Sequence, residues 1–135
     1  MQKREAAFQT RFGRWIKYNW NENSLFELKY CRGNALPFSA VKAHQTQNLL
    51  NAKHRKIFWK FQDWTFNQTP ADCFSLAKAS GYVVIQYASK KRPNTTFFLV
   101  DIDDFYRESR QSKRKSLTME RAREIGRECQ LGVVD

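Results

Sequence analysis

Long apolar runs are absent from this sequence of 135 residues. No stretch approaches the ~20 consecutive apolar residues that a membrane-spanning helix needs. The first residues, MQKREAAF, lack the apolar core of a secretory signal. Cysteine is scarce as well, because Cys31, Cys73 and Cys129 are far apart and match no zinc-binding spacing. We therefore expect a cytoplasmic protein with reduced thiols and no membrane partner.

Acidic residues are the second scarcity. The chain has 24 Lys and Arg against 13 Asp and Glu, a formal net charge of +11. Between Leu28 and Val100, eleven basic residues accompany only two acids, Asp63 and Asp72. A basic excess of this size indicates a polyanionic partner, most commonly nucleic acid. Two isolated carboxylates in such a field are either structural, as caps or salt-bridge partners, or ligands of a metal ion.

The remaining composition is that of one folded domain, with 41% hydrophobic and 15% aromatic residues. Apolar residues at helical spacing predict a helix over 3–18, with Glu5 on its inward stripe. A second helix from about 40 to 53 would be capped by Ser39, and a short third helix by Asp103. We expect a turn at Ser80–Gly81. Strands are predicted at 24–30, 55–64, 71–77, 82–88 and 96–102, and a last helix at about 118–129.

This order of elements predicts a single α/β domain over 1–135, in which helices flank a central mixed sheet. A basic linker and the last helix, at about 107–130, would close the chain. Within the sheet, the strand SLFELKY carries two unexpected charges. Glu27 and Lys29 share one face of the strand, whereas Phe26, Leu28 and Tyr30 share the other, because strand side chains alternate.

Two interpretations of this charged pair stay open. It is either a solvated acid–base pair on an amphipathic strand or part of a nuclease metal site. In a nuclease site, the Glu27 carboxylate and the Leu28 backbone carbonyl would bind a hard divalent ion. Lys29 would orient or deprotonate the attacking water and stabilise the charge on the phosphorus centre. The second interpretation needs another carboxylate nearby.

Three segments resemble a known family. FELK on a strand, HQTQNLL opening the next helix and KRKSLTMERAREIG near the end are similar to the PD-(D/E)XK nuclease superfamily. The chain resembles its RecU-type and archaeal-type Holliday-junction resolvases, and its small size is phage-like. The resemblance implies a restriction-endonuclease-like core and Mg²⁺- or Mn²⁺-dependent symmetric nicking of four-way DNA junctions. It also implies a homodimer, working on branched double-stranded DNA in a bacterial, archaeal or phage-infected host cell.

The sequence departs from this family in one respect. The family places a metal-binding aspartate on a strand just before the E-x-K strand, where this chain has no Pro-Asp. TPAD looks like a displaced Pro-Asp motif, so Asp72 is our first candidate for the missing ligand and Asp63 the second. Asp72 would then bring its strand beside the FELK strand. Alternatively, PADCF and YVVIQYA form the family hairpin, with Gln86 and Ala88 replacing its Glu and Lys.

Two further residues take roles only through this resemblance. Gln45 would orient the water or Lys29, and Glu5 would reach the metal through a water. Each also has a plain structural alternative, because Gln45 can cap its helix and Glu5 can pair with Arg4 or Lys3.

Three basic clusters are candidates for DNA binding, and their phosphate contacts would make affinity strongly dependent on salt. The clusters are Arg11, Arg14 and Lys17; Lys90, Lys91 and Arg92; and Lys113, Arg114 and Lys115.

A symmetric cut in two strands requires a two-fold dimer. Four tryptophans that we expect to be exposed are candidates for its interface, namely Trp15, Trp20, Trp59 and Trp64.

Two rival functions stay open. One is another nuclease of the superfamily, nicking or end-processing, and the other is a non-catalytic basic nucleic-acid-binding protein on a degenerate nuclease fold.

Overall fold

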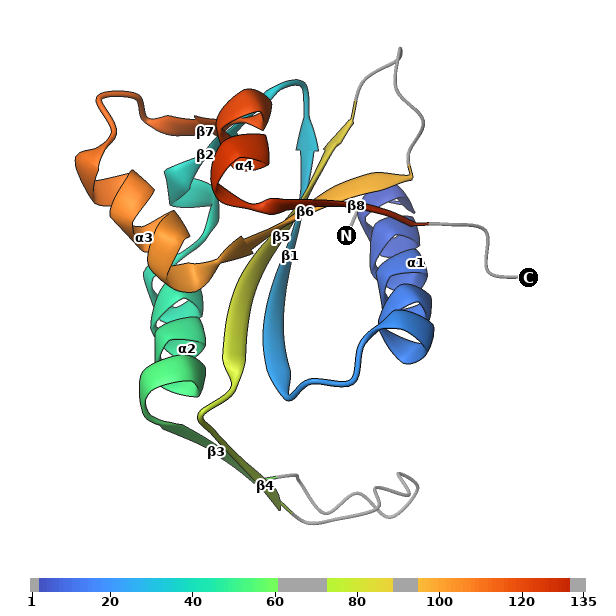
Figure 1. Cartoon of the computed structure of the whole chain (residues 1–135), viewed down its shortest axis with the longest axis vertical. Coiled ribbons are helices and arrows are strands. Elements are labelled where there is room, and N and C mark those ends of the chain that lie inside the picture. Colours follow the sequence, from blue (N-terminus) through green and yellow to red (C-terminus); the bar gives the residue numbers. More distant parts are fainter. Residues whose placement is uncertain (1–2, 61–72, 89–94, 132–135) are drawn as a thin grey trace.

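A four-stranded mixed sheet forms the centre of the protein, with helices on both of its faces (Figure 1). The computed structural model describes residues 3–60, 73–88 and 95–131. The expected α/β class with a central mixed sheet flanked by helices is therefore confirmed. Neighbouring strands follow the order β1 (Ser24–Arg32), β5 (Ser80–Ala88), β6 (Thr96–Asp101) and β8 (Arg127–Gln130), with β1 and β5 parallel and the other pairs antiparallel.

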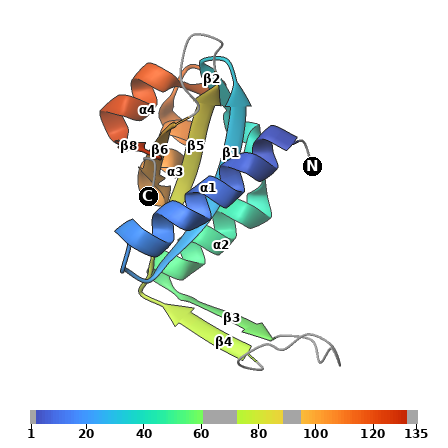
Figure 2. The same cartoon turned by 90° about the vertical axis from the view of Figure 1, so that its right-hand side faces the viewer.

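One face of the sheet is covered by α1 (Lys3–Asn19), as Figure 2 shows. The apolar stripe predicted for this helix is confirmed, because Phe8, Phe12 and Trp15 are buried against Phe97 of β6. Trp15 is buried in this core and Trp20 is partly buried against it, so neither is the exposed residue that the sequence led us to expect. Among the described helices, none is long and apolar enough to cross a membrane.

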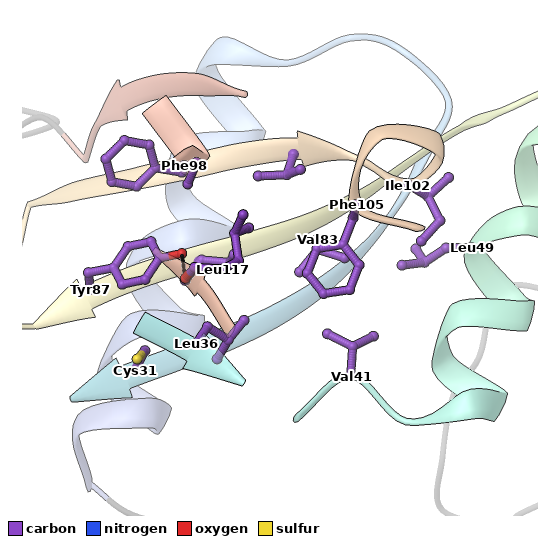
Figure 3. Close-up of a cluster of buried hydrophobic side chains, with 13 residues drawn as sticks. Cys31, Leu36, Val41, Leu49, Val83, Tyr87, Phe98, Ile102, Phe105 and Leu117 are labelled. Carbon is purple, nitrogen blue, oxygen red and sulfur yellow. Dashed lines mark hydrogen bonds between the residues drawn. The ribbon is translucent and has the colours of Figure 1, made fainter. Parts of the chain in front are cut away.

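The opposite face is covered by α2 (Ala43–His54), α3 (Ile102–Gln111) and α4 (Met119–Ile125). Figure 3 shows their shared core, in which Leu49 and Phe105 pack with residues of the sheet. The Tyr87 hydroxyl donates a hydrogen bond to the Leu117 carbonyl at 2.9 Å and so ties β5 to a small second sheet. That sheet pairs β2 (Ala35–Pro37) with β7 (Ser116–Thr118), and a short helical turn, η1 (Phe38–Ala40), follows β2.

A two-stranded ribbon projects from the body of the protein (Figures 1 and 2). It pairs β3 (Lys56–Lys60) with β4 (Cys73–Ala77) in antiparallel register. The prediction that the strand after TPAD lies beside the FELK strand is therefore wrong, because β4 pairs with β3 while β1 pairs with β5. Asp63 and Asp72 themselves lie outside the described residues.

Several predicted boundaries differ from the structure. Ser39 lies in η1, and α2 is preceded by Lys42 at its N-cap. The cap of α3 is Asp101, whose side chain accepts a hydrogen bond from the Asp103 N–H at 2.9 Å. Ser80 and Gly81 belong to β5 and do not form the expected turn. A β-carbon at Gly81 would lie 2.8 Å from the Leu49 carbonyl oxygen. Close packing against α2, not turn geometry, therefore requires this glycine.

The expected last helix over 118–129 is divided in the structure. The helix α4 ends at Ile125, and β8 begins at Arg127. The segment at 107–130 is thus not a linker followed by one helix, since it includes the end of α3, the strand β7, α4 and β8.

A cluster of charged side chains joins the end of α2 to the start of α3. Lys53 Nζ lies 2.8 Å from Asp101 Oδ1 and 2.6 Å from Asp103 Oδ2, and His54 Nε2 lies 2.8 Å from Asp103 Oδ1. Burial alone would raise the pKa of the Asp103 carboxyl. The hydrogen bonds and charges of Lys53 and His54 outweigh burial, so the net effect lowers this pKa below its ordinary value.

We expect Asp103→Asn to lower the free energy of unfolding at pH 7 by about 1 kcal/mol. Because the folded pKa is lowered, the carboxylate contributes stability above its unfolded pKa and loses it as the pH falls below about 4. Urea unfolding at neutral and acid pH measures the difference, which should vanish in acid. Asp104→Asn is the control, since Asp104 also lies in the first turn of α3 but pairs only with the exposed Arg107. Equal losses in both variants would contradict the prediction.

Candidate functional site

Glu27 and Lys29 lie on the face of β1 opposite to α1. Their neighbours Phe26, Leu28 and Tyr30 pack toward the α1 core, so alternation directs the charged pair to the face that α2 covers. The shared face predicted from the sequence is confirmed. Lys29 Nζ lies 3.3 Å from Glu27 Oε1, and the two side chains are 18% and 27% exposed. The pair is thus mostly buried, and a minor part of each side chain is exposed to solvent.

The backbone of β1 pairs with another strand on one side only within the described part of the chain. Ser80 donates its N–H to the Asn23 carbonyl at 3.0 Å, and Gly33 donates its N–H to the Ala88 carbonyl at 2.9 Å. The backbone groups of odd-numbered residues of β1 therefore point toward β5. The Leu28 carbonyl points the other way, since successive residues of a strand alternate. Among the described residues, no strand pairs with β1 on that outer side.

Gln45 takes a structural role at the start of α2. Its Oε1 accepts a hydrogen bond from the Lys42 N–H at 2.9 Å. This bond satisfies one of the N–H groups that a helix start leaves without an intrahelical partner. Of the two roles that the sequence left open for Gln45, the cap is the one present.

Glu5 lies in the first turn of α1, and no hydrogen bond or ion pair joins it to Glu27 among the described residues. Glu5 is on α1, which packs against one face of the sheet, whereas Glu27 points to the opposite face. The expectation that Glu5 reaches a metal at Glu27 through a water stays a prediction. Within 3–60, 73–88 and 95–131, no three His, Cys, Asp or Glu side chains gather as a metal site. The two remaining candidates, Asp63 and Asp72, lie outside these ranges.

The predicted DNA-binding clusters occupy different sides of the molecule. Arg14 and Lys17 are exposed on α1, over one face of the sheet. The second cluster is exposed between α3 and β7, on the side of the core that α2, α3 and α4 share. It consists of Lys113, Arg114 and Lys115. These two clusters therefore do not form one surface. Arg11 is half-buried on α1, and residues 90–92 lie outside the described residues.

Thiol chemistry is not indicated by the two buried cysteines. Burial raises the pKa of both the Cys31 and the Cys129 thiols. A raised pKa reduces the fraction of the nucleophilic thiolate at neutral pH.

Sequence reasoning missed a set of exposed aromatic and basic side chains on the β3–β4 ribbon. Phe58 is 63% exposed, and Lys56 and Lys60 are exposed on the same strand. The available signal was the alternation of Lys, Phe and Lys in KIFWK, which places all three on one face.

We found no relative of this chain among known proteins. No family model matches the chain, and neither a curated protein nor a solved structure is detectably similar to it.

Proposed function

We propose that this protein is a structure-selective DNA endonuclease of the PD-(D/E)XK type, a Holliday-junction resolvase that nicks four-way junctions symmetrically. The observation that carries the proposal is the arrangement on β1. Glu27 and Lys29 share one face with their charged atoms 3.3 Å apart, and the intervening Leu28 carbonyl points to the side of β1 on which no described strand pairs. The parallel β1–α2–β5 unit that follows agrees with the E-x-K strand, helix and strand of that superfamily.

The described donors suit a hard divalent cation in type. Carboxylate and backbone carbonyl oxygens are the ligands that Mg²⁺ and Mn²⁺ prefer, and Glu27 and Leu28 supply one of each. Such an ion, when bound, would polarise the phosphodiester and lower the pKa of a coordinated water. A second carboxylate would come from Asp72, or from Asp63.

The residues of the chain then have separate tasks. Glu27 would hold the cation with one oxygen and keep Lys29 in place with the other. The Lys29 ammonium would donate a hydrogen bond toward the attacking water or the phosphate. Its positive charge would then stabilise the negative charge that develops during phosphodiester cleavage. Basic surface residues, Arg14 and Lys17 on α1 among them, would bind phosphates away from the cleavage site, because α1 covers the other face of the sheet.

Two copies of the chain would act together on one junction. Symmetric nicking places two equivalent active sites at positions related by a two-fold axis, so we include a homodimer in the proposal.

A substrate panel tests the proposed activity. Purified protein is incubated with Mg²⁺ or Mn²⁺ and a labelled four-way junction, linear duplex, flap or single strand of the same sequence. We expect paired nicks at symmetry-related positions of the junction and none on the linear duplex. EDTA is the control and should remove cleavage but not binding. Cleavage of flaps or ends in preference to junctions would instead support another nuclease of the superfamily.

One observation favours a second candidate function. Glu27 is the only carboxylate that the described residues place on the E-x-K face of β1. A chain without a second ligand would be a nucleic-acid-binding protein on a degenerate nuclease fold. Tight binding of the junction with no product in either metal ion would support this alternative over the nuclease.

A further inference from the structure

The β3–β4 ribbon exposes more aromatic surface than any other described part of the chain. Three of the five large hydrophobic side chains that remain exposed belong to it, namely Phe58 at 63%, Trp59 at 58% and Phe74 at 42%. Exposed aromatic side chains that gather in one place usually mark a binding surface. The ribbon also projects from the body, so a ligand can approach it (Figure 2).

The register of the ribbon sorts these residues onto two faces. Trp59 lies opposite Phe74, and Ile57 lies opposite Leu76, so these four share one face. The other face carries Lys56, Phe58 and Lys60, which we call the platform. Their cross-strand neighbours are the small residues Ala77, Ser75 and Cys73, respectively.

The platform presents a flat ring between two cations. Ser75, directly across from Phe58, is too small to cover the ring, which agrees with its 63% exposure. Lys56 and Lys60 lie two residues before and after Phe58, about 7 Å away along the strand. The described ribbon segments 55–60 and 73–78 contain four basic residues and no acidic one. The charge of this surface is therefore complementary to a polyanion.

We propose that the platform binds unpaired bases of a nucleic-acid strand. The Phe58 ring stacks on a base, while Lys56 and Lys60 bind the flanking phosphates. Stacking suits an unpaired base, because a base inside a duplex is already covered on both of its faces. The proposal rests on the nucleic-acid partner of the proposed function and deepens it, since it makes unpaired bases near a branch point part of the substrate.

Binding of a labelled oligothymidylate to the full chain in EDTA tests the platform. Phe58→Ala should weaken the affinity about tenfold, within the range for loss of one stacked base. Phe58→Trp should keep it, because tryptophan offers a larger ring. Tyr106→Ala is the matched control and should bind as the unchanged protein does, since Tyr106 is an exposed aromatic on α3. Circular dichroism checks that each variant is folded.

The lysines have a separate readout. Changing both Lys56 and Lys60 to glutamine should reduce the slope of log affinity against log salt by about 1.4, at ~0.7 for each phosphate contact to a single strand. An unchanged slope would show that these lysines do not contact phosphates and would overturn their part of the proposal.

The remaining outcomes separate this proposal from the nuclease. If Phe58→Ala binds oligothymidylate as tightly as the unchanged protein, the platform is wrong. It is also wrong if the variant instead converts a dimer to a monomer in sedimentation, since the ribbon would then contact a second copy. If the unchanged protein cuts no substrate but Phe58→Ala still loses oligothymidylate, the platform stands and the nuclease fails.

Discussion

Glu27→Gln is expected to abolish metal-dependent cleavage of a four-way junction, with a loss of at least about a hundredfold in rate. The substitution keeps the size of the side chain and removes its charge, so it removes a cation ligand without creating a cavity. The 3.3 Å pair with Lys29 is partly exposed, so its loss should cost only about 0–1 kcal/mol of stability. The variant should therefore stay folded and still bind the junction. Single-turnover cleavage in Mg²⁺ and Mn²⁺, with binding measured in EDTA, provides both readouts.

Glu22→Gln is the matched control, because Glu22 is an exposed carboxylate just before β1. It should cleave at the rate of the unchanged protein. The same assay on Asp72→Ala and Asp63→Ala separates the two candidates for the second ligand. Cleavage that survives in Asp72→Ala would reject Asp72, and cleavage that survives in Glu27→Gln would reduce the pair on β1 to a surface salt bridge.

The parts of this site that the sequence predicts are those governed by local geometry. Glu27 and Lys29 share a face because any strand alternates its side chains, whatever its neighbours are. Phe8, Phe12 and Trp15 are buried together because helical spacing brings them to one stripe. Neither result depends on how distant segments pair.

Pairing between distant strands was not predictable in the same way. The residue pattern of β4 would suit several positions in a sheet. Its pairing with β3 rather than β1 is decided by packing over the whole chain. The sequence also could not decide which of two neighbouring aspartates caps α3. Asp101 and Asp103 are both good N-cap residues, and the end of β6 selects Asp101. The predicted neighbourhood of the TPAD and FELK strands depended on strand pairing, which is why it failed, whereas the role of Asp72 as a ligand stays a prediction.

The end of the chain shows how tertiary contacts override a local pattern. The residues MERAREIGREC have helical spacing, yet the helix stops at Ile125 and β8 adds to β6. Gly126 lies at this change of direction, where its N–H donates to the Ala122 carbonyl at 2.8 Å. Its φ of −117° is open to any residue, so the requirement for glycine is one of space rather than of conformation.

Gly126→Ala is expected to lower the free energy of unfolding by about 3 kcal/mol, as overpacking of a close contact does. A β-carbon there would lie 2.7 Å from the Leu99 carbonyl oxygen and 2.8 Å from the Ala122 carbonyl oxygen. Both oxygens belong to the backbone of packed elements, so relief requires α4 or β8 to move from β6. Urea unfolding followed by circular dichroism measures the change.

Gly13→Ala is the control for the effect of adding a methyl group. Gly13 lies in α1 with nothing within 4 Å of its β-carbon position, so alanine should stabilise the protein by about 1 kcal/mol through helix propensity. The two substitutions are chemically identical and should shift the unfolding midpoint in opposite directions. A shift of the same sign and size in both variants would show that the contact of Gly126 with β6 does not hold the last strand in place.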